Sequence, residues 1–362
     1  MRSFAYTAAL CAALAFVFIS CGTAPPDAGV FEPADDARPL RYSIVCVIHG
    51  DGGYLYHDTS GKAHRADETV LARMRLVGKR NGLAEVFIFH QRPRRRFLFI
   101  FPRSDGTMYH YRRGRLVSKE DYRRTGGPER FSPEAGLFDE ARSETGEGVV
   151  RLFLYFGHEV PEDGAGGYDS SHGDWTFSPE DLARGLEELS SGEGPFDLAV
   201  LSTCHGGTVR TIGALASWAS HIVASPGDLH LSHFDTALLE DAGAMQRAGG
   251  AEALADQFAR RAFEALRGYV QTSITVAVYD AGAVRGYVES AAAPYDSAAA
   301  AARADEPGSF ERCDCADIEG FPVQGMNEGV IVYYRPPAFG PLKRKDSHSG
   351  WECWRAKNPW SR

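Results

Sequence analysis

Residues 196–207 read FDLAVLSTCHGG, an apolar run that ends in a cysteine, a histidine and two glycines. Its length and continuous apolar character are typical of a strand that is buried on both faces of a parallel sheet. The cysteine can simply pack there, because a reduced cysteine behaves as a small hydrophobic residue. It can also react, because α/β proteins present their chemical groups at the carboxyl ends of strands. The neighbouring segments distinguish between these interpretations.

A second run of this kind, VVRLFLYF (149–156), is followed by Gly157, His158 and Glu159. Between the two runs, SPEDLARGLEELSSG (178–192) predicts a helix that is capped by its first serine and stopped by its last glycine. A strand–helix–strand unit brings both strand ends to one edge of a sheet. We therefore expect His158 beside Cys204.

A cysteine next to a histidine is the residue pair expected in an active site with a cysteine nucleophile. The thiolate is the reactive form of cysteine, so a catalytic cysteine needs a nearby base or a positive field. His158 is the candidate base and Cys204 the candidate nucleophile. A helix expected over 208–220 would add its N-terminal dipole, and Gly206 and Gly207 would let backbone N–H groups approach a substrate.

Similar patterns along the chain predict an α/β fold with right-handed crossovers. Closely spaced strands within 85–125 predict an antiparallel hairpin on the sheet edge, and the low-complexity stretch 290–309 predicts a mixture of helix and loop. The other predicted strands cover 42–48, 85–90, 96–101, 107–113, 221–225 and 274–280, and a further helix covers 249–270.

The N-terminal segment predicts export. Residues 1–21 have the pattern of a signal peptide and end in FISC, which resembles a bacterial lipoprotein box with Cys21 as the lipidated residue. Ordinary cleavage near Ser20 is the alternative. Residues 22–41 are rich in Pro, Ala and Asp and predict a tether, so we expect an extracytoplasmic domain that is lipid-anchored to a bacterial membrane. The net charge of −9 and the scattered basic residues give no indication of a nucleic-acid partner.

Five cysteines remain outside this segment. An odd number leaves at least one thiol unpaired within the chain in an oxidising compartment. Either Cys313 or Cys315 is a candidate to bridge to Cys353. Cys46 is most simply a buried strand residue, which leaves Cys204 as the candidate reactive thiol.

The strand ending in His, the crossover and the strand ending in Cys resemble the caspase-like cysteine peptidases, above all the clostripain family. The resemblance covers about 42–340, which leaves 341–362 as a C-terminal tail. Further motifs that resemble the family are YSIVCVIHGDGG (42–53), HIVASPGDLHLSHFD (221–235), TSITVAVYDAGAVRGYV (272–288) and DIEGF (317–321).

The resemblance implies a three-layer α/β sandwich with a mostly parallel central sheet, and a cysteine endopeptidase that acts on peptides or proteins. It implies a Cys204/His158 dyad, with the backbone N–H groups of Cys204 and Glu159 stabilising the oxyanion. Ser202, Ser225 and Asp228 would contact the substrate. No cofactor or metal is required, although some relatives need calcium.

Two positions depart from the family pattern. Glu159 replaces the usual glycine after the histidine, and Ser202 replaces the acidic residue of members that cleave after basic residues, for which Asp228 and Asp235 are possible substitutes. A catalytically impaired, caspase-like binding module is therefore one alternative.

Other chemistry is also open. An α/β-hydrolase with a cysteine nucleophile would use His221, His230 or His233 as its base. Within the leading hypothesis, His172, His49 and His205 are alternative histidines. A zinc site from Cys204, His205 and another histidine has no supporting spacing.

Overall fold

The centre of the molecule is a nine-stranded sheet whose five middle strands are parallel. The computed structural model describes residues 39–357 apart from 52–53, 58–60, 94–95, 98–100, 103, 126–130, 144–145, 163–175, 230–234, 269, 306–307 and 323–327. The described residues belong to one compact unit, Asp36–Arg362. The predicted signal peptide with Cys21, and the tether up to residue 38, lie outside them.

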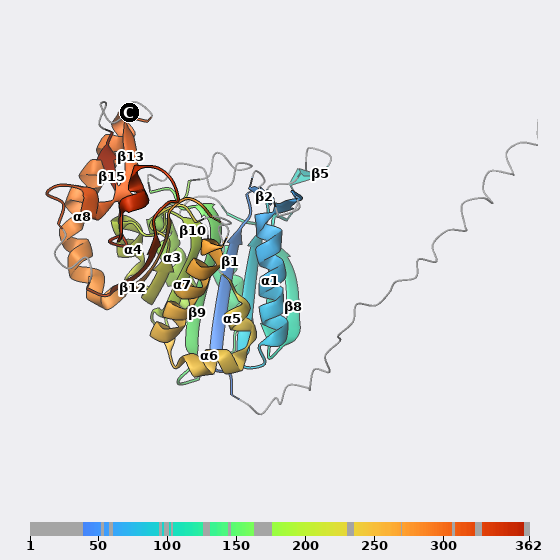
Figure 1. Cartoon of the computed structure of the whole chain (residues 1–362). Coiled ribbons are helices and arrows are strands. Elements are labelled where there is room, and N and C mark those ends of the chain that lie inside the picture. Colours follow the sequence, from blue (N-terminus) through green and yellow to red (C-terminus); the bar gives the residue numbers. More distant parts are fainter. Residues whose placement is uncertain are drawn as a thin grey trace, which may run out of the picture. The chain divides into compact units, whose positions relative to one another are not determined.

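The parallel strands lie side by side in the order β4, β1, β9, β10 and β11. Figure 1 shows β9 and β1 in the middle of the sheet. Their bounds are β4 Ala84–Gln91, β1 Tyr42–His49, β9 Val150–Glu159, β10 Phe196–Cys204 and β11 Ala219–Ala224. Tyr42 of β1 is level with Val150 of β9, so the strands begin together and their carboxyl ends meet at one edge.

Antiparallel strands complete the sheet at both ends. Next to β4 lies the hairpin of β7 (Gly106–Arg112) and β8 (Arg115–Tyr122), and next to β11 lie β12 (Ile274–Asp280) and β14 (Val330–Arg335). The predicted α/β class with an edge hairpin is confirmed. Three two-stranded sheets are formed by β2 (Leu55–His57) with β3 (Ala63–Arg65), β5 (Arg96–Phe97) with β6 (Phe101–Pro102), and β13 (Phe310–Asp314) with β15 (Glu352–Ala356).

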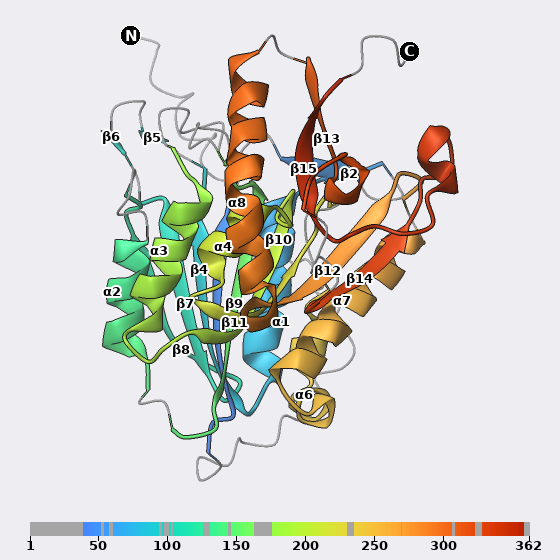
Figure 2. The same cartoon turned by 90° about the vertical axis from the view of Figure 1, so that its left-hand side faces the viewer.

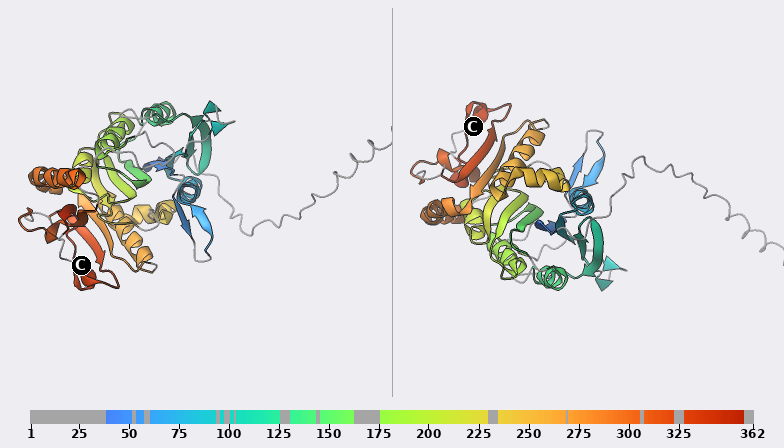
Figure 3. Two further views of the ribbon diagram at one scale, coloured as in Figure 1. Left: turned by 90° about the horizontal axis from the view of Figure 1, so that it is seen from above. Right: turned by 90° about the horizontal axis from the view of Figure 1, so that it is seen from below.

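Helices cover both faces of the large sheet, which makes three layers (Figures 2 and 3). One face is covered by α2 (Ser132–Ala141), α3 (Pro179–Ser190), α4 (Val209–Leu215) and α8 (Ala281–Ala304). The other is covered by α1 (Ala66–Arg80), α5 (Ala237–Glu240), α6 (Ala242–Ala248) and α7 (Ala251–Arg267). Two short 3-10 helices are η4 (Cys315–Asp317) and η5 (Pro341–Arg344). No helix in the described part of the chain is long and apolar enough to cross a membrane.

Two cores result from the alternation of side chains along the central strands. Val45 and Phe153 pack under α2–α4 and α8, whereas Ile44 and Leu152 pack under α1 and α7. Because successive side chains point to opposite faces, a strand that is covered on both sides needs an apolar residue at nearly every position. This is why the two decisive sequence runs are continuously apolar.

Two sequence predictions for helices need correction. The helix expected over 208–220 ends at Leu215, because a turn through Trp218 leads the chain into β11, where the Trp218 carbonyl accepts a bond from the Phe196 N–H. Residues 290–304, expected to mix helix and loop, are the second half of one continuous helix, α8. Their many alanines favour helix over any alternative.

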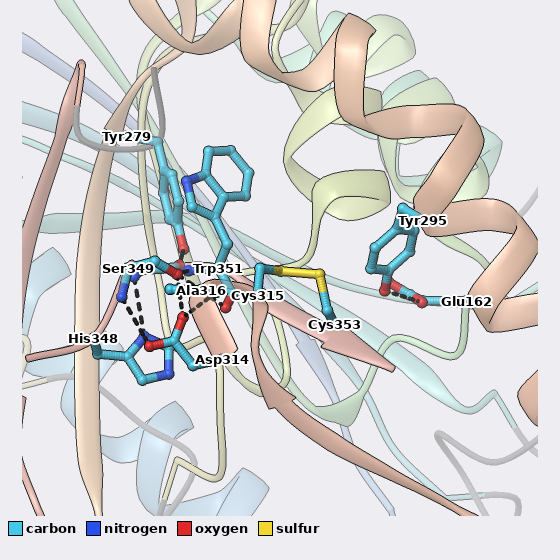
Figure 4. The surroundings of a disulfide bond; sticks show 11 residues. Glu162, Tyr279, Tyr295, Asp314, Cys315, Ala316, His348, Ser349, Trp351 and Cys353 are labelled. Atoms are coloured by element: carbon cyan, nitrogen blue, oxygen red, sulfur yellow. Dashed lines mark hydrogen bonds and ion pairs between the residues drawn. A yellow bond between two sulfur atoms is a disulfide. The ribbon is translucent and has the colours of Figure 1, made fainter. Parts of the chain in front are cut away.

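A disulfide between Cys315 and Cys353 joins η4, which directly follows β13, to β15, with the two Cα atoms 5.0 Å apart (Figure 4). β15 comes from the segment expected as a tail, yet it pairs along the whole of β13. Beside the disulfide, the fully buried Trp351 packs against Tyr279 of β12. Among the residues that the structure describes, Cys46, Cys204 and Cys313 form no disulfide. We name residues 310–317 and 348–356 the C-terminal lobe.

We expect the double substitution Cys315→Ser with Cys353→Ser to lower the free energy of unfolding by about 2–4 kcal/mol, because the disulfide closes a long loop. Denaturant unfolding of the non-reduced proteins measures the difference. Cys313→Ser is the matched control and should change stability much less. Peptide mapping that finds Cys313 bonded to Cys353 would contradict the assigned pairing.

Candidate active site

β9 and β10 bring His158 and Cys204 to the same edge of the sheet. Their register pairs Ser202 with Phe156 and then Cys204 with Glu159, so a bulge in β9 inserts one residue just before the strand ends. Such bulges re-aim side chains at strand ends. His158 therefore lies one residue before the direct partner of Cys204.

Both side chains belong to the face of the sheet that α1 and α7 cover. Cys204 packs against the core on that face. The His158 ring stacks on Tyr54, with ring centroids 5.2 Å apart, and Tyr54 in turn stacks on Phe156 of the same core. The structure thus places the two predicted residues at the ends of adjacent strands and on one face.

His158 has two neighbours that the sequence analysis did not identify. Asp51 lies with a carboxylate oxygen 3.7 Å from His158 Nδ1, and only 8% of the Asp51 side chain is exposed. Tyr54 supports the flat side of the ring. Both come from the loop after β1, and the end of β1 lies at the same sheet edge. Their position directly after a predicted parallel strand is the sequence feature that could have identified them. At 3.7 Å the Asp51 carboxylate is within ion-pair distance of Nδ1 but beyond hydrogen-bond distance.

The sulfur of Cys204 accepts a hydrogen bond from the backbone N–H of Leu229 at 3.3 Å. The same sulfur lies 3.8 Å from the Leu229 carbonyl, to which the thiol form can donate, so these two contacts do not select one ionisation state. The N-terminal dipole of α4 was expected to stabilise a thiolate on Cys204. It is poorly placed to do so, because the buried side chains of α4 belong to the core on the opposite face of the sheet.

The residue after the cysteine, His205, is held by two carboxylates. Its Nδ1 is 2.9 Å from Glu352 of β15, and its Nε2 is 3.2 Å from Asp228. Burial opposes the charged form of His205, but the bonds to Asp228 and Glu352 outweigh it and raise the pKa of the imidazole to about 9. A positive charge therefore lies next to Cys204 at neutral pH. Burial raises the pKa of Glu352 itself, although its bonds to His205 oppose this shift.

Glu159, which stands where the family has glycine, forms an ion pair with Arg312 at 2.5 Å. Arg312 also contacts Glu352 at 3.2 Å. The C-terminal lobe therefore contacts the residue that follows each member of the predicted dyad. Sequence reasoning missed these contacts, because Glu352 and Arg312 are far from their partners along the chain.

The second glycine after Cys204, Gly207, has a packing role. A Cβ on Gly207 would lie 2.7 Å from the Cα of Pro226, which no side chain tolerates. The Gly207 N–H already donates to the carbonyl of Ser225 at 3.0 Å, so the expectation that it faces a substrate is wrong. The His205 N–H is likewise engaged by the Gly227 carbonyl.

The three predicted substrate contacts differ in their surroundings. Ser225 is fully buried, and its hydroxyl donates to the carbonyls of Gly227 and Thr275, so it holds the turn after β11. Asp228 is 68% exposed and faces His205. Ser202 is almost buried and lines a small cavity beneath Cys204.

Two of the histidines considered as alternative bases, His49 and His221, lie elsewhere on the sheet. His49 is buried on the opposite face, where its Nδ1 bonds the hydroxyl of Tyr155 at 2.9 Å. His221 of β11 is level with Leu198, near the start of β10, so it cannot serve as the base of an α/β-hydrolase. His172, His230 and His233 lie outside the described residues.

Among the described residues, the group of side chains that could hold a metal ion does not include Cys204. Asp67, Glu68 and His90 cluster within 4.8 Å, but Asp67 is already bonded to His90 and Arg65. Both ring nitrogens of His205 are held by carboxylates, which disfavours the zinc alternative. The calcium requirement stays a prediction.

We expect His205→Gln to destabilise the protein in a pH-dependent way. Because the folded-state pKa of about 9 exceeds the unfolded value, the charged histidine stabilises the fold fully below about pH 6.5 and loses this effect as the pH rises through 9. The stability difference from the wild type should shrink by roughly 3 kcal/mol between pH 6 and pH 10. Urea unfolding across this range measures it.

Arg210→Gln is a suitable control, because it removes a surface ion pair with Glu180 that involves no histidine. Its effect should be nearly the same at both pH values. An equally constant difference for His205→Gln would show that His205 is not held in its charged form.

Comparison with solved structures identifies the fold. A C11 protease from Parabacteroides distasonis, solved as an inactive zymogen, aligns with a TM-score of 0.55 and 12% identity over 88% of this chain and 92% of its own. A secreted C11 cysteine protease from Bacteroides thetaiotaomicron, in complex with an irreversible peptide inhibitor, aligns with a TM-score of 0.53 and 10% identity over 88% of this chain and 90% of its own. No protein-family model matches the sequence, and neither does any curated protein. The chain thus has the caspase-like α/β fold of the C11, or clostripain-family, cysteine proteases.

Proposed function

We propose that this chain is an extracytoplasmic cysteine endopeptidase that uses a Cys204/His158 dyad. The observation that carries the proposal is the placement of both residues at the ends of adjacent parallel strands, on one face, in a fold shared with C11 cysteine proteases. One such protease binds an irreversible peptide inhibitor.

The reaction begins when His158 Nε2 takes the proton of the Cys204 thiol. The thiolate attacks the carbonyl carbon of the substrate, and the carbonyl oxygen becomes an oxyanion that the backbone N–H groups of Cys204 and Glu159 stabilise. Each such donor contributes on the order of 3 kcal/mol. The protonated His158 then gives its proton to the leaving amine, which leaves a thioester on Cys204. Water, activated by His158, hydrolyses the thioester.

Asp51 fits the role of a positioning residue in this scheme. It lies beside Nδ1, the nitrogen that does not exchange protons with the cysteine, at 3.7 Å. The charge of a carboxylate on this side of the ring stabilises the imidazolium that forms in each half of the reaction. The stacking on Tyr54 restricts rotation of the ring.

Glu159 stands where the family has glycine, but its ion pair with Arg312 is compatible with activity. The glutamate side chain is neutralised and drawn toward the C-terminal lobe, so it does not place an unpaired negative charge beside the oxyanion. The rival binding-module hypothesis rests on both Glu159 and Ser202, and the ion pair weakens the part of it that depends on Glu159.

Several observations support a location outside the cytoplasm. The Cys315–Cys353 disulfide is of the kind that persists in oxidising compartments. Two structural neighbours are described as secreted. Together with the signal-like N-terminus, these favour export, with Cys21 as the proposed site of lipid attachment.

We expect iodoacetamide at pH 7 to alkylate Cys204 much faster than Cys313, which serves as an internal reference. Burial raises the pKa of the Cys313 thiol to about 11, so this thiol is almost entirely protonated. His158→Ala should slow the alkylation of Cys204 and leave Cys313 unchanged. Peptide mapping by mass spectrometry measures both rates in one sample.

Peptide-library digestion tests turnover directly. Cys204→Ala should abolish cleavage, and His158→Ala should reduce it by about 10²–10⁴-fold, as expected for the loss of a general base. Alkylation of Cys204 no faster than that of free cysteine, together with no cleavage, would refute the peptidase and favour the binding module.

A further inference from the structure

Basic side chains gather at the edge of the sheet opposite to the predicted dyad. β1, β4 and β9 begin together at this edge, because Tyr42 is level with both Ala84 and Val150. The antiparallel β7 ends there, since Arg112 is level with Glu85, and α1 ends there just before β4 begins. We name six residues the basic edge: Arg41, Lys79, Arg80, Arg112, Arg113 and Arg115.

Backbone contacts join the basic edge into one surface. The Arg41 N–H donates to the carbonyl of Leu83 at 2.9 Å, and the Arg113 N–H donates to the carbonyl of the next residue at 3.0 Å. A Cβ on Gly114 would lie 2.9 Å from the carbonyl oxygen of Lys79, so the turn between β7 and β8 packs on the end of α1. Basic residues that are scattered along the sequence thus meet in the fold.

Three described carboxylates lie against these residues. The buried Glu85 holds Arg112 at 2.8 Å, and Glu240 holds Arg80 at 2.5 Å. Glu147 shares a hollow of about 320 Å3 with Arg112. The basic edge therefore keeps an excess of positive charge, although the chain as a whole has a net charge of −9.

Half of the basic edge is available to a partner outside the chain. Arg41, Lys79 and Arg115 are exposed, and none of them forms an ion pair with another described residue. Leu116 and Val117, which follow Arg115 on the outermost strand β8, are about half exposed. Positive charge beside exposed apolar side chains is typical of surfaces that bind anionic membranes.

The N-terminal end of the described chain lies beside the basic edge. Pro39 and Leu40, the first two described residues, line the same hollow as Arg112 and Arg113. Cys21, the proposed site of lipid attachment, precedes Pro39 by 18 residues, and a chain of that length spans at most about 60 Å. A lipid at Cys21 would hold the basic edge near the membrane, where even a weak second contact becomes effective.

We propose that the basic edge docks on the anionic phospholipid surface of the membrane that carries the anchor, so that the edge with Cys204 points away from it. The eight residues of β1 separate the two edges by about 26 Å, which places the candidate active site beyond the lipid headgroups. The proposal rests on the location and the lipid attachment proposed above, and it does not depend on turnover at Cys204.

Vesicle sedimentation of the chain from residue 22 to 362 tests this surface without the lipid, because this chain contains the whole compact unit Asp36–Arg362. We expect at least ten-fold stronger binding to vesicles of phosphatidylcholine with phosphatidylglycerol than to phosphatidylcholine alone. High salt should abolish the binding, since it screens the charges. Equal binding to both vesicles would overturn the proposal. Tight binding to heparin with none to anionic vesicles would assign the basic edge to an acidic polysaccharide and overturn it too.

The triple variant Arg41→Gln, Lys79→Gln and Arg115→Gln locates the contact. Each basic residue near an anionic membrane strengthens binding roughly five-fold, so this variant should bind the anionic vesicles about 100-fold more weakly. Thermal unfolding shows that it is folded, and its cleavage of peptides should equal that of the wild type, because none of the three residues belongs to the candidate active site.

The matched control removes the same charge elsewhere, through Arg303→Gln, Lys343→Gln and Arg344→Gln. These exposed residues lie on α8 and η5, so their loss should change vesicle binding less than about three-fold. An equal loss of binding in both triple variants would show that the attraction depends on net charge alone, and would overturn the basic edge as the docking surface.

The orientation is tested with phospholipids that carry bromine, which quenches tryptophan fluorescence on contact. Leu116→Trp lies beside the basic edge and Leu342→Trp lies on η5, and the two leucines are similarly exposed, at 50% and 56%. Quenching beyond that of the wild type should appear only with Leu116→Trp. Stronger quenching of Leu342→Trp would overturn the orientation.

The mass of the full chain isolated from bacterial membranes reports lipid attachment separately. A chain without lipid whose unanchored form still binds anionic vesicles through the basic edge would overturn the anchor alone. A lipidated chain whose unanchored form does not bind them would overturn the docking surface alone.

Discussion

The burial of five parallel strands on both faces is the constraint on which the rest of this structure depends. Parallel strands need long crossovers, and these supply the helices that cover the sheet. The same geometry sends every carboxyl end to one edge, where the chain leaves the sheet and polar residues become tolerable. Asp51, His158 and Cys204 all occupy this edge, so the fold itself gathers the groups that the proposed chemistry needs.

Much of this arrangement follows from local sequence. The runs that become β1, β9, β10 and β12 are apolar and bounded by polar residues, and α3 has its cap at Ser178. The adjacency of His158 and Cys204 follows from the crossover alone. The bulge in β9 does not, because it changes which residue opposes Cys204 without changing the composition of the strand.

The contacts that define the electrostatics of the site could not be predicted in this way. His205 meets Glu352 across 147 residues, and Glu159 meets Arg312 across 153. Such ion pairs leave no periodicity and no spacing in the sequence, since they depend on where the C-terminal lobe docks. The position of His49 was also beyond local reasoning: like His158 it ends a strand, but it faces the other core.

The contacts of Glu352 impose an order on assembly. When His205 leaves the ribosome, 147 further residues must follow before its carboxylate partner exists. The disulfide that fastens β15 forms only where thiols are oxidised. The segment after Cys204 therefore acquires its final support only after the C-terminal strand has been made and its disulfide has formed.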